Sequence, residues 1–234
     1  NKNTVTISSY EKRKKITTNP LNYINKLIKN FDIKIPKKLP FMSSMLVGYF
    51  SYDIIRYIEK IPDRCKSDLD IPDIRLSRPK SLVIYDNLKK KIHYVENVFA
   101  DTKIRDYERT YEEILNKFKS YENYENIKLP EQFTLKKNLN KIKSNISKIK
   151  FKNIVKKAKD FIKKGDIFQV VLSQRFERKI EKKPIEIYNY LRKSNPSPFM
   201  FYFNYKDFNI LGSSPEILVR LRKNQVTIRP IAGT

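Results

Sequence analysis

The sequence predicts an α+β fold in which large antiparallel β-sheets pack against helices. Apolar residues recur at helical spacing in two long segments, 107–121 and 151–164. Strand-like segments in the last part of the chain follow one another across short polar turns, as in antiparallel hairpins. A helix, a strand, a second helix and then successive hairpins favour an antiparallel sheet over a parallel sheet of the Rossmann type.

The first part of the chain, to about residue 122, mixes helix and strand. "LVGYFSYDIIRYIEKIP" (46–62) begins as a strand and continues as a helix that stops at Pro62. Residues 80–99 predict a β-hairpin that turns near Asp86-Asn87-Leu88. The helix over 107–121 carries an apolar stripe of the kind that packs into a core: Tyr107, Tyr111, Ile114, Leu115, Phe118 and Tyr121.

The helix over 151–164 ends at Gly165, a typical C-terminal cap, after two lysines that suit the helix dipole. A strand, "DIFQVVLSQRFERKI" (166–180), is predicted to follow, with Gln169 among its apolar residues. The amide of Gln169 needs a partner. Either it bonds a neighbouring strand in the core, or it points into a pocket.

The remaining elements are a short helix that begins at Pro184 and two hairpins. The hairpins are predicted to turn at Lys206-Asp207 and at Lys223-Asn224. We therefore expect three parts: an N-terminal region over 1–122, a linker or surface excursion over 123–149, rich in Asn and Lys, and a second region over 150–234.

The net charge of +25 allows a basic nucleic-acid-binding protein as one hypothesis. The lysines, however, are scattered along the whole chain, with abundant Asn, Ile, Tyr and Phe and with little Gly. This pattern is typical of coding DNA that has drifted toward A and T. We favour drift, and expect neither a nucleic-acid partner nor a use for the charge beyond solubility and loose association.

Because this drift lowers the number of glycines, the positions that keep a glycine are informative. The chain has only four, whereas average usage would give about sixteen. Each survivor is expected to hold a backbone position that a side chain would not tolerate: Gly48, Gly165, Gly212 and Gly233.

Several classes of protein are excluded or disfavoured. No apolar run approaches the roughly 18–20 residues of a membrane span, and the first residues lack the apolar region of a secretory signal. A single cysteine, Cys65, and a single histidine, His93, cannot form an internal disulfide or a Cys/His metal cluster. Gly-rich phosphate loops are absent. We expect a cytoplasmic protein without a membrane partner.

Four segments together resemble anthranilate synthase component I, of the chorismate-utilising enzyme family: "GDIFQVVLSQRF" (165–176), "NPSPFMFYF" (195–203), "LGSSPEILVRL" (211–221) and "RPIAGT" (229–234). Residues 46–59 resemble the N-terminal region of that family. All four glycines fall inside these segments. The resemblance implies an incomplete fragment of the component I fold, cut at its start and at Thr234, and inactive by itself.

The resemblance implies a lyase that converts chorismate and ammonia to anthranilate and pyruvate, the first step of tryptophan biosynthesis. It further implies feedback inhibition by L-tryptophan and a glutamine amidotransferase subunit, component II, as the source of ammonia in a heterotetramer. A Mg²⁺ cofactor is implied as well, with ligands beyond Thr234 and with none among these residues.

By the same resemblance, Gly233 and Thr234 bind chorismate, and Pro198, Phe199 and Met200 bind L-tryptophan. A backbone N–H at glycine and a threonine hydroxyl can donate to a carboxylate or a ring oxygen. Proline, an aromatic ring and a thioether suit a flat indole. Judged without the resemblance, Phe199 and Met200 would be ordinary core residues. The serine that the family's tryptophan site takes from an upstream segment has no counterpart before residue 46.

Gln169 and Ala232 are expected to line the active site and to separate this chain from its relatives. Isochorismate synthases carry a lysine base at the position of Gln169, and aminodeoxychorismate synthases carry a nucleophilic lysine at that of Ala232. Both positions lack lysine here, which leaves room for free ammonia. These two activities remain the alternatives within the family, and a relative that binds tryptophan without catalysis is a further one.

Overall fold

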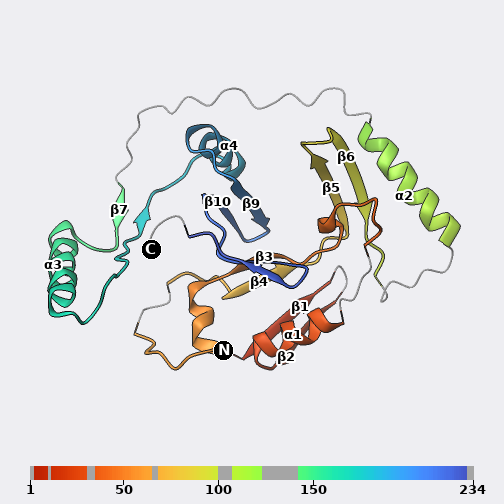
Figure 1. Ribbon diagram of the computed structural model, residues 1–234. Coiled ribbons are helices and arrows are strands. Elements are labelled where there is room, and N and C mark those ends of the chain that lie inside the picture. The colour runs from red at the N-terminus through yellow and green to blue at the C-terminus, as the bar shows by residue number, and fades with distance from the viewer. Residues whose placement is uncertain are drawn as a thin grey trace. The chain divides into compact units, whose positions relative to one another are not determined.

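The computed structural model describes residues 3–9, 12–30, 35–64, 68–99, 107–122 and 142–230 (Figure 1). The chain forms two compact units, Asn1–Ile127 and Lys128–Thr234. The division falls inside the segment 123–149 that the sequence predicts as a linker, much of which lies outside the described residues. The exact domain bounds stay a prediction.

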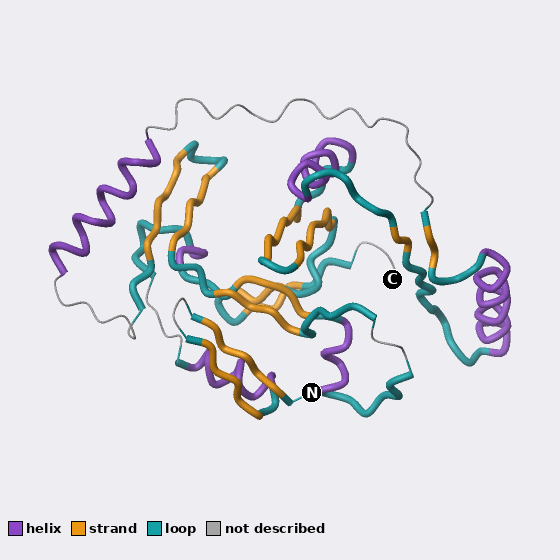
Figure 2. Tube along the Cα trace, turned by 180° about the vertical axis from the view of Figure 1, so that it is seen from behind, coloured by secondary structure: helices purple, strands orange, loops and turns teal. Residues whose placement is uncertain are grey.

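Every strand of the described chain lies in a two-stranded antiparallel pair (Figure 2). The pairs of the first unit are β1 (Thr4–Ser8) with β2 (Arg13–Thr17), β3 (Val47–Phe50) with β4 (Ile74–Ser77), and β5 (Ser81–Asp86) with β6 (Lys91–Glu96). Those of the second unit are β7 (Lys143–Ser144) with β8 (Phe176–Glu177), β9 (Phe199–Tyr205) with β10 (Phe208–Ser214), and β11 (Arg220–Arg222) with β12 (Gln225–Thr227). Together with the helices, this confirms the α+β class.

The hairpin turns lie where the sequence predicts them. Between β5 and β6 the Asp86 carboxylate accepts hydrogen bonds from the backbone amides of Leu88 and Lys89, each at 3.0 Å. Lys223 and Asn224, between β11 and β12, both have positive φ angles, 46° and 63°. Two successive left-handed residues form the turn whose twist matches that of antiparallel strands.

The described residues of the first unit form two α-helices and two short 3₁₀ helices: α1 (Pro20–Lys29), η1 (Phe41–Ser43), η2 (Tyr52–Tyr57) and α2 (Tyr107–Glu122). The helix predicted after the strand at residue 47 is therefore a single 3₁₀ segment, η2. Its Tyr and β-branched Ile residues have only moderate helix propensity. Six residues are also too few to offset the free energy of nucleating an α-helix.

Helix α2 is fastened to the β5–β6 hairpin by the carboxylate of Glu96, whose side chain is only 5% exposed. Lys117 of α2 donates to Glu96 at 3.1 Å and to the Ser81 hydroxyl at 2.7 Å, and Lys80 lies 3.7 Å from the same carboxylate. Burial acts to raise the pKa of Glu96, but the hydrogen bonds from Ser81 and Lys117 and the nearby lysine charges outweigh it and lower the pKa.

The apolar stripe of α2 is only partly buried, so the prediction that it packs into a core is wrong for Tyr107 and Tyr111, which are exposed. Phe118 is half-buried against Tyr94 of β6, with ring centroids 5.5 Å apart. The contacts of α2 with the hairpin thus lie near Lys117 and Phe118, and leave the first turns of the helix in solvent.

The second unit contains α3 (Lys148–Lys164) and α4 (Pro184–Ser194). The Ser147 hydroxyl accepts from the backbone amide of Lys150 at 3.3 Å and caps the start of α3. Gly165 ends α3 with a left-handed φ of +80°, as predicted. Ala158, near the middle of the helix, is buried.

The strand predicted over 166–180 is wrong for most of its length, because only Phe176–Glu177 forms a ladder. A strand needs a neighbour along its edge, and β7 offers two residues. Within the described chain, residues 167–173 form no backbone hydrogen bond. Phe168 is 99% exposed and Val171 is 75% exposed. The apolar pattern is therefore present without the sheet it predicts.

Two glycines sit where another backbone or ring approaches closely. A Cβ atom at Gly48 would overlap the carbonyl oxygen of Arg75 on β4, and one at Gly212 would overlap the ring of Phe201 on β9. With Gly165, these positions confirm the expectation for three of the four glycines. Gly233 lies outside the described residues.

The described part of the chain has a small core. Its buried apolar residues are Pro20, Val95, Ala158 and Tyr205. None of its helices combines the length and the apolar character that crossing a lipid bilayer would require.

Candidate functional site

Pro198, Phe199 and Met200 lie at the start of β9, directly after the loop that follows α4. Phe199 is 40% exposed, and Met200 is half-buried. In the ladder Phe199 pairs with Ser214 and Met200 with Ser213, so the end of β10 lies beside them. The structure therefore brings two of the motif segments together, 195–203 and 211–221.

Two serine hydroxyls, Ser197 and Ser213, lock these segments to each other, and we refer to them as the serine clasp. Ser213 Oγ donates to the carbonyl of Asn195 at 2.6 Å, and Ser197 Oγ donates to the carbonyl of Ser214 at 2.8 Å. One bond runs from each side, so the loop before β9 is held at two points. A loop held in this way presents its side chains in a fixed geometry.

A row of aromatic rings continues from the clasp along β9. Phe201, Phe203 and Tyr205 alternate along the strand and so share one face, with centroid distances of 5.6 and 5.9 Å between successive rings. On β10, Phe208 extends the row at 5.1 Å from Tyr205. Gly212 leaves room for the ring of Phe201, its partner in the ladder. The hairpin is thus a stiff support for Pro198–Met200.

Gln169 lies in the segment that forms no ladder, and its side chain is exposed. It is therefore not a buried amide bonded to a neighbouring strand, which was one of the two interpretations. Its predicted place at the active site stays a prediction. Ala232, Gly233 and Thr234 lie outside the described residues, and their roles stay predictions as well.

Among the described residues, no group of three or more His, Cys, Asp or Glu side chains is arranged to hold a metal ion. The described residues therefore do not fit a Mg²⁺ ion by themselves.

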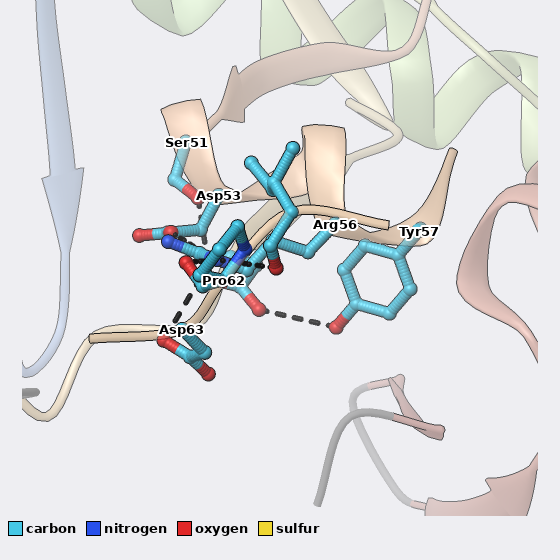
Figure 3. A network of polar contacts seen from close by, with 8 residues as sticks. Ser51, Asp53, Arg56, Tyr57, Pro62 and Asp63 are labelled. Carbon is cyan, nitrogen blue, oxygen red and sulfur yellow. Dashed lines mark hydrogen bonds and ion pairs between the residues drawn. The ribbon is translucent and has the colours of Figure 1, made fainter. Parts of the chain in front are cut away.

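A polar network organises the segment that resembles the N-terminal region of the family (Figure 3). Arg56 of η2 donates to Asp53 at 2.7 Å and to the carbonyl oxygens of Pro62 and Ile61 at 2.7 and 3.3 Å. Asp63 lies 3.8 Å from the same guanidinium. Arg56 thus folds the chain after η2 back onto the helix.

A third carboxylate, that of Asp73, lies directly before β4 and ties this point of the chain to η2. Asp73 accepts from the Ser51 hydroxyl at 3.2 Å and from the Tyr57 hydroxyl at 3.1 Å. Burial, followed by the hydrogen bond and the charge of Asp73, raises the pKa of Tyr57 to about 12. Tyr57 therefore stays protonated near neutral pH, and its hydroxyl donates the hydrogen bond that joins η2 to Asp73.

Sequence reasoning missed both the serine clasp and Asp73. The clasp serines lie in the "NPSP" and "GSSPE" segments that carry the family resemblance. Ser197 lies between two prolines just before a strand, which is typical of a hydrogen-bonding residue of turns, and that signal could have drawn attention to it. Ser213, between Gly212 and Ser214, carries no such signal. Asp73 had no local signal, because its partners are 16 and 22 residues away in the chain.

The arrangement of helices and antiparallel pairs is similar to that of a solved enzyme structure. The chain is similar to the crystal structure of anthranilate synthase component I from Streptococcus pneumoniae TIGR4, with a TM-score of 0.75 and 28% identity. The similarity covers 97% of this chain and 52% of the other.

The sequence comparisons identify the family. The profile described as chorismate binding enzyme matches residues 2–234, and the chain belongs to this family. It is 37% identical over 220 residues to anthranilate synthase component 1 of Cereibacter sphaeroides, covering 92% of this chain and 43% of that protein. It is 39% identical over 226 residues to the Aquifex aeolicus protein of the same name, covering 93% and 44%. The chain spans a little under half the length of these relatives.

Proposed function

We propose that these residues belong to component I of an anthranilate synthase, a lyase that converts chorismate and ammonia to anthranilate, pyruvate and water. The observation that carries the proposal is the family match over residues 2–234, together with relatives named anthranilate synthase component 1. In this reaction ammonia bonds to C2 of the ring as the 4-hydroxyl leaves, and the enolpyruvyl group is then lost as pyruvate.

In this proposal, Gly233 and Thr234 bind chorismate through a backbone N–H and a hydroxyl. Gln169 and Ala232 line the pocket without contributing an amine, so the nucleophile is free ammonia. The Mg²⁺ ion of the resembled enzymes acts as a Lewis acid. We place its ligands in the part of the relatives that this chain does not match.

The partner proposed is a glutamine amidotransferase subunit that supplies ammonia, in a cytoplasmic heterotetramer. The name component 1, which the relatives carry, implies a second component. Pull-down of this chain's complete protein with the amidotransferase subunit of a relative tests the pairing. A requirement for free ammonium at every glutamine concentration would contradict it.

For the reaction, the test is to express the complete reading frame and to measure anthranilate by its fluorescence with chorismate and ammonium. Anthranilate as the product supports the proposal, whereas isochorismate or aminodeoxychorismate as the sole product overturns it. The Ala232→Lys variant is expected to lose ammonia addition or to form a covalent adduct. Ala232→Ser, which stays small and lacks an amine, is the matched control. The 234 residues alone are expected to be inactive.

We also propose that Pro198, Phe199 and Met200 line a site for L-tryptophan, the feedback inhibitor. The support is the geometry of the serine clasp, which fixes this stretch beside the end of β10. Phe199 offers an exposed ring on which an indole can stack, and Met200 offers a polarisable thioether.

Equilibrium dialysis of the complete protein against radiolabelled L-tryptophan tests this site. It should give saturable binding that Met200→Ala weakens by about tenfold. Met42→Ala, at another partly exposed methionine, serves as the control. Equal affinities of the two variants would remove Met200 from the proposed site.

A further inference from the structure

One edge of helix α3 carries a straight row of exposed lysines. Successive members lie three or four residues apart, the spacing that places side chains on one side of a helix. The five side chains, which we call the lysine row, are Lys148, Lys152, Lys156, Lys159 and Lys163. From Lys148 to Lys163 the helix rises about 22 Å. Positive charge is therefore gathered here along one line, although lysines occur along the whole chain.

Mutational drift does not account for this row. Drift acts on the whole gene, so it should favour lysine to a similar degree in helices of similar length. Helix α2 has four acidic residues and three basic ones among 16 residues, whereas α3 has one acidic residue and eight lysines among 17. The difference between the two helices therefore has a cause that is specific to α3.

The lysine row acts against the stability of its own helix. Like charges three or four residues apart repel each other, and the first turn of α3 holds Lys148 and Lys150 without an acidic residue, at the end where the helix dipole disfavours cations. On α2, by contrast, Arg109 pairs with Glu113 at 3.2 Å. Among the described residues, no acidic side chain forms an ion pair with the lysine row. An anion bound along the row would relieve this repulsion.

The shape of the lysine row fits the phosphates of a nucleic acid. Each strand of a duplex carries one negative charge per about 3.4 Å of its axis, so a row of this length can face several successive phosphates. Phe151 and Phe161 lie on the apolar side of α3, away from the row, and so offer no stacking surface for bases beside it. A membrane would take up the apolar side of an amphipathic helix, and on that side of α3 Ala158 is buried.

We propose that the lysine row of α3 binds the phosphate backbone of nucleic acid, without preference for sequence. This binding goes beyond the proposed function and does not depend on it. It differs from the expectation drawn from composition, because composition counts the lysines and does not show where they gather. Each phosphate that a lysine neutralises releases counterions, so the affinity should fall steeply with salt.

The test measures the fluorescence anisotropy of a labelled DNA duplex, two helical turns long, as the complete protein is added at several salt concentrations. We expect saturable binding in which the logarithm of the association constant falls with the logarithm of the salt concentration, with a slope of about −4.5 for five phosphate contacts. A duplex of different sequence should bind equally well. Absence of binding, a slope near zero, or a strong preference for one sequence overturns the proposal.

A row variant removes the charge of the three central lysines: Lys152→Gln, Lys156→Gln and Lys159→Gln. Glutamine has nearly the same helix propensity as lysine, so α3 should stay helical, which circular dichroism checks. The variant should bind the duplex at least about tenfold more weakly, with a salt slope shallower by about 3. Arginine at the same three positions keeps the charge and should keep the affinity. Undiminished binding by the glutamine variant, or loss of binding by the arginine variant, contradicts the proposal.

The matched control removes three exposed lysines of the first unit: Lys12→Gln, Lys14→Gln and Lys60→Gln. It lowers the net charge by the same amount and should weaken binding by less than about twofold. Equal weakening by both variants would show that the net charge, rather than the lysine row, attracts the duplex, and would overturn the proposal. Cosedimentation with vesicles of phosphatidylcholine and phosphatidylserine tests the membrane alternative. Binding to the vesicles that needs the row, without binding to the duplex, would also overturn the proposal.

Discussion

The β9–β10 hairpin and the segment Ile167–Ser173, which we call the open strand, have similarly apolar sequences and reach different structures. Both are rich in apolar residues, and both were predicted as strands. Each of the seven residues of β9 has a partner in β10, across a turn at Lys206-Asp207. The open strand has no partner in the described chain. Tyr205 is 8% exposed, whereas Phe168 is 99% exposed.

The comparison shows that an apolar strand pattern is not enough to form a sheet. Whether the segment pairs depends on whether a partner strand lies close to it. The partner of β9 follows after two residues, so closing the loop loses little chain entropy. Among the described residues, the open strand has no such neighbour in sequence, and the nearby strand β7 is only two residues long. The same apolar side chains therefore stabilise one region and leave the other in water. Substitutions of the same kind should accordingly have unequal effects in the two regions.

The largest difference between the two regions is expected in the free energy of unfolding when an aromatic ring is removed. Tyr205→Ala removes a buried ring that lies against Phe203 and Phe208, and should lower the free energy of unfolding by about 3 kcal/mol. Phe168→Ala, in the open strand, should change it by less than about 0.5 kcal/mol. Urea unfolding followed by circular dichroism measures both. Similar losses would mean that Phe168 is packed.

The second largest difference in stability is expected when a larger side chain is introduced. Gly212→Val forces a side chain into the ring of Phe201 and should destabilise the hairpin by about 2 kcal/mol. Ser173→Val adds bulk at an exposed position of the open strand and should be nearly neutral. Thermal unfolding of the two variants makes the comparison, and a stable Gly212→Val protein would show that the ring can move aside.

A smaller effect is expected at the cap that leads into the open strand. Gly165→Ala places a side chain at a φ of +80° and should reduce stability by about 1 kcal/mol. Gly165→Asn should be tolerated better, because asparagine enters the left-handed region more readily. Helical circular dichroism during urea unfolding distinguishes the two variants. Equal stabilities would contradict the cap geometry.

The smallest effect is expected at the serine clasp. Ser213→Ala removes one hydrogen bond to the Asn195 carbonyl and should cost about 1 kcal/mol or less. Ser173→Ala removes an exposed hydroxyl from the open strand and should have no effect. Faster exchange of the amides between Asn195 and Met200 in Ser213→Ala alone would support the clasp. Unchanged exchange would show that the β9–β10 ladder, rather than the serine clasp, holds this loop in place.

The parts of the fold that the sequence predicted are those with local causes. The cap at Gly165, the helix start at Pro184 and the turn at Lys223-Asn224 each depend on a few adjacent residues. The unpaired state of residues 167–173 could not be predicted, since it depends on the absence of a neighbouring strand from the described chain. The 3₁₀ form of η2 was missed because its pattern fits either helix type.

The residues of the candidate site also fall into those that the sequence indicated and those that only the fold reveals. Pro198, Phe199 and Met200 were placed by resemblance, and the structure adds the serine clasp that holds them. The clasp pairs residues 17 and 18 positions apart, which no local spacing predicts. Asp73, which joins Ser51 and Tyr57, is a similar case. Residues that meet across a turn of the fold are visible only once the fold is known.

The buried Glu96 has a consequence for how this sequence can evolve. Mutation toward A and T adds lysines easily, and the chain holds 50 basic residues for 25 acidic ones. Glu96 lies between Lys80 and Lys117. Its replacement would leave two ammonium groups facing each other and would release a whole helix rather than a single side chain. The scarce carboxylates, more than the plentiful lysines, are therefore the residues that this part of the molecule can least afford to lose.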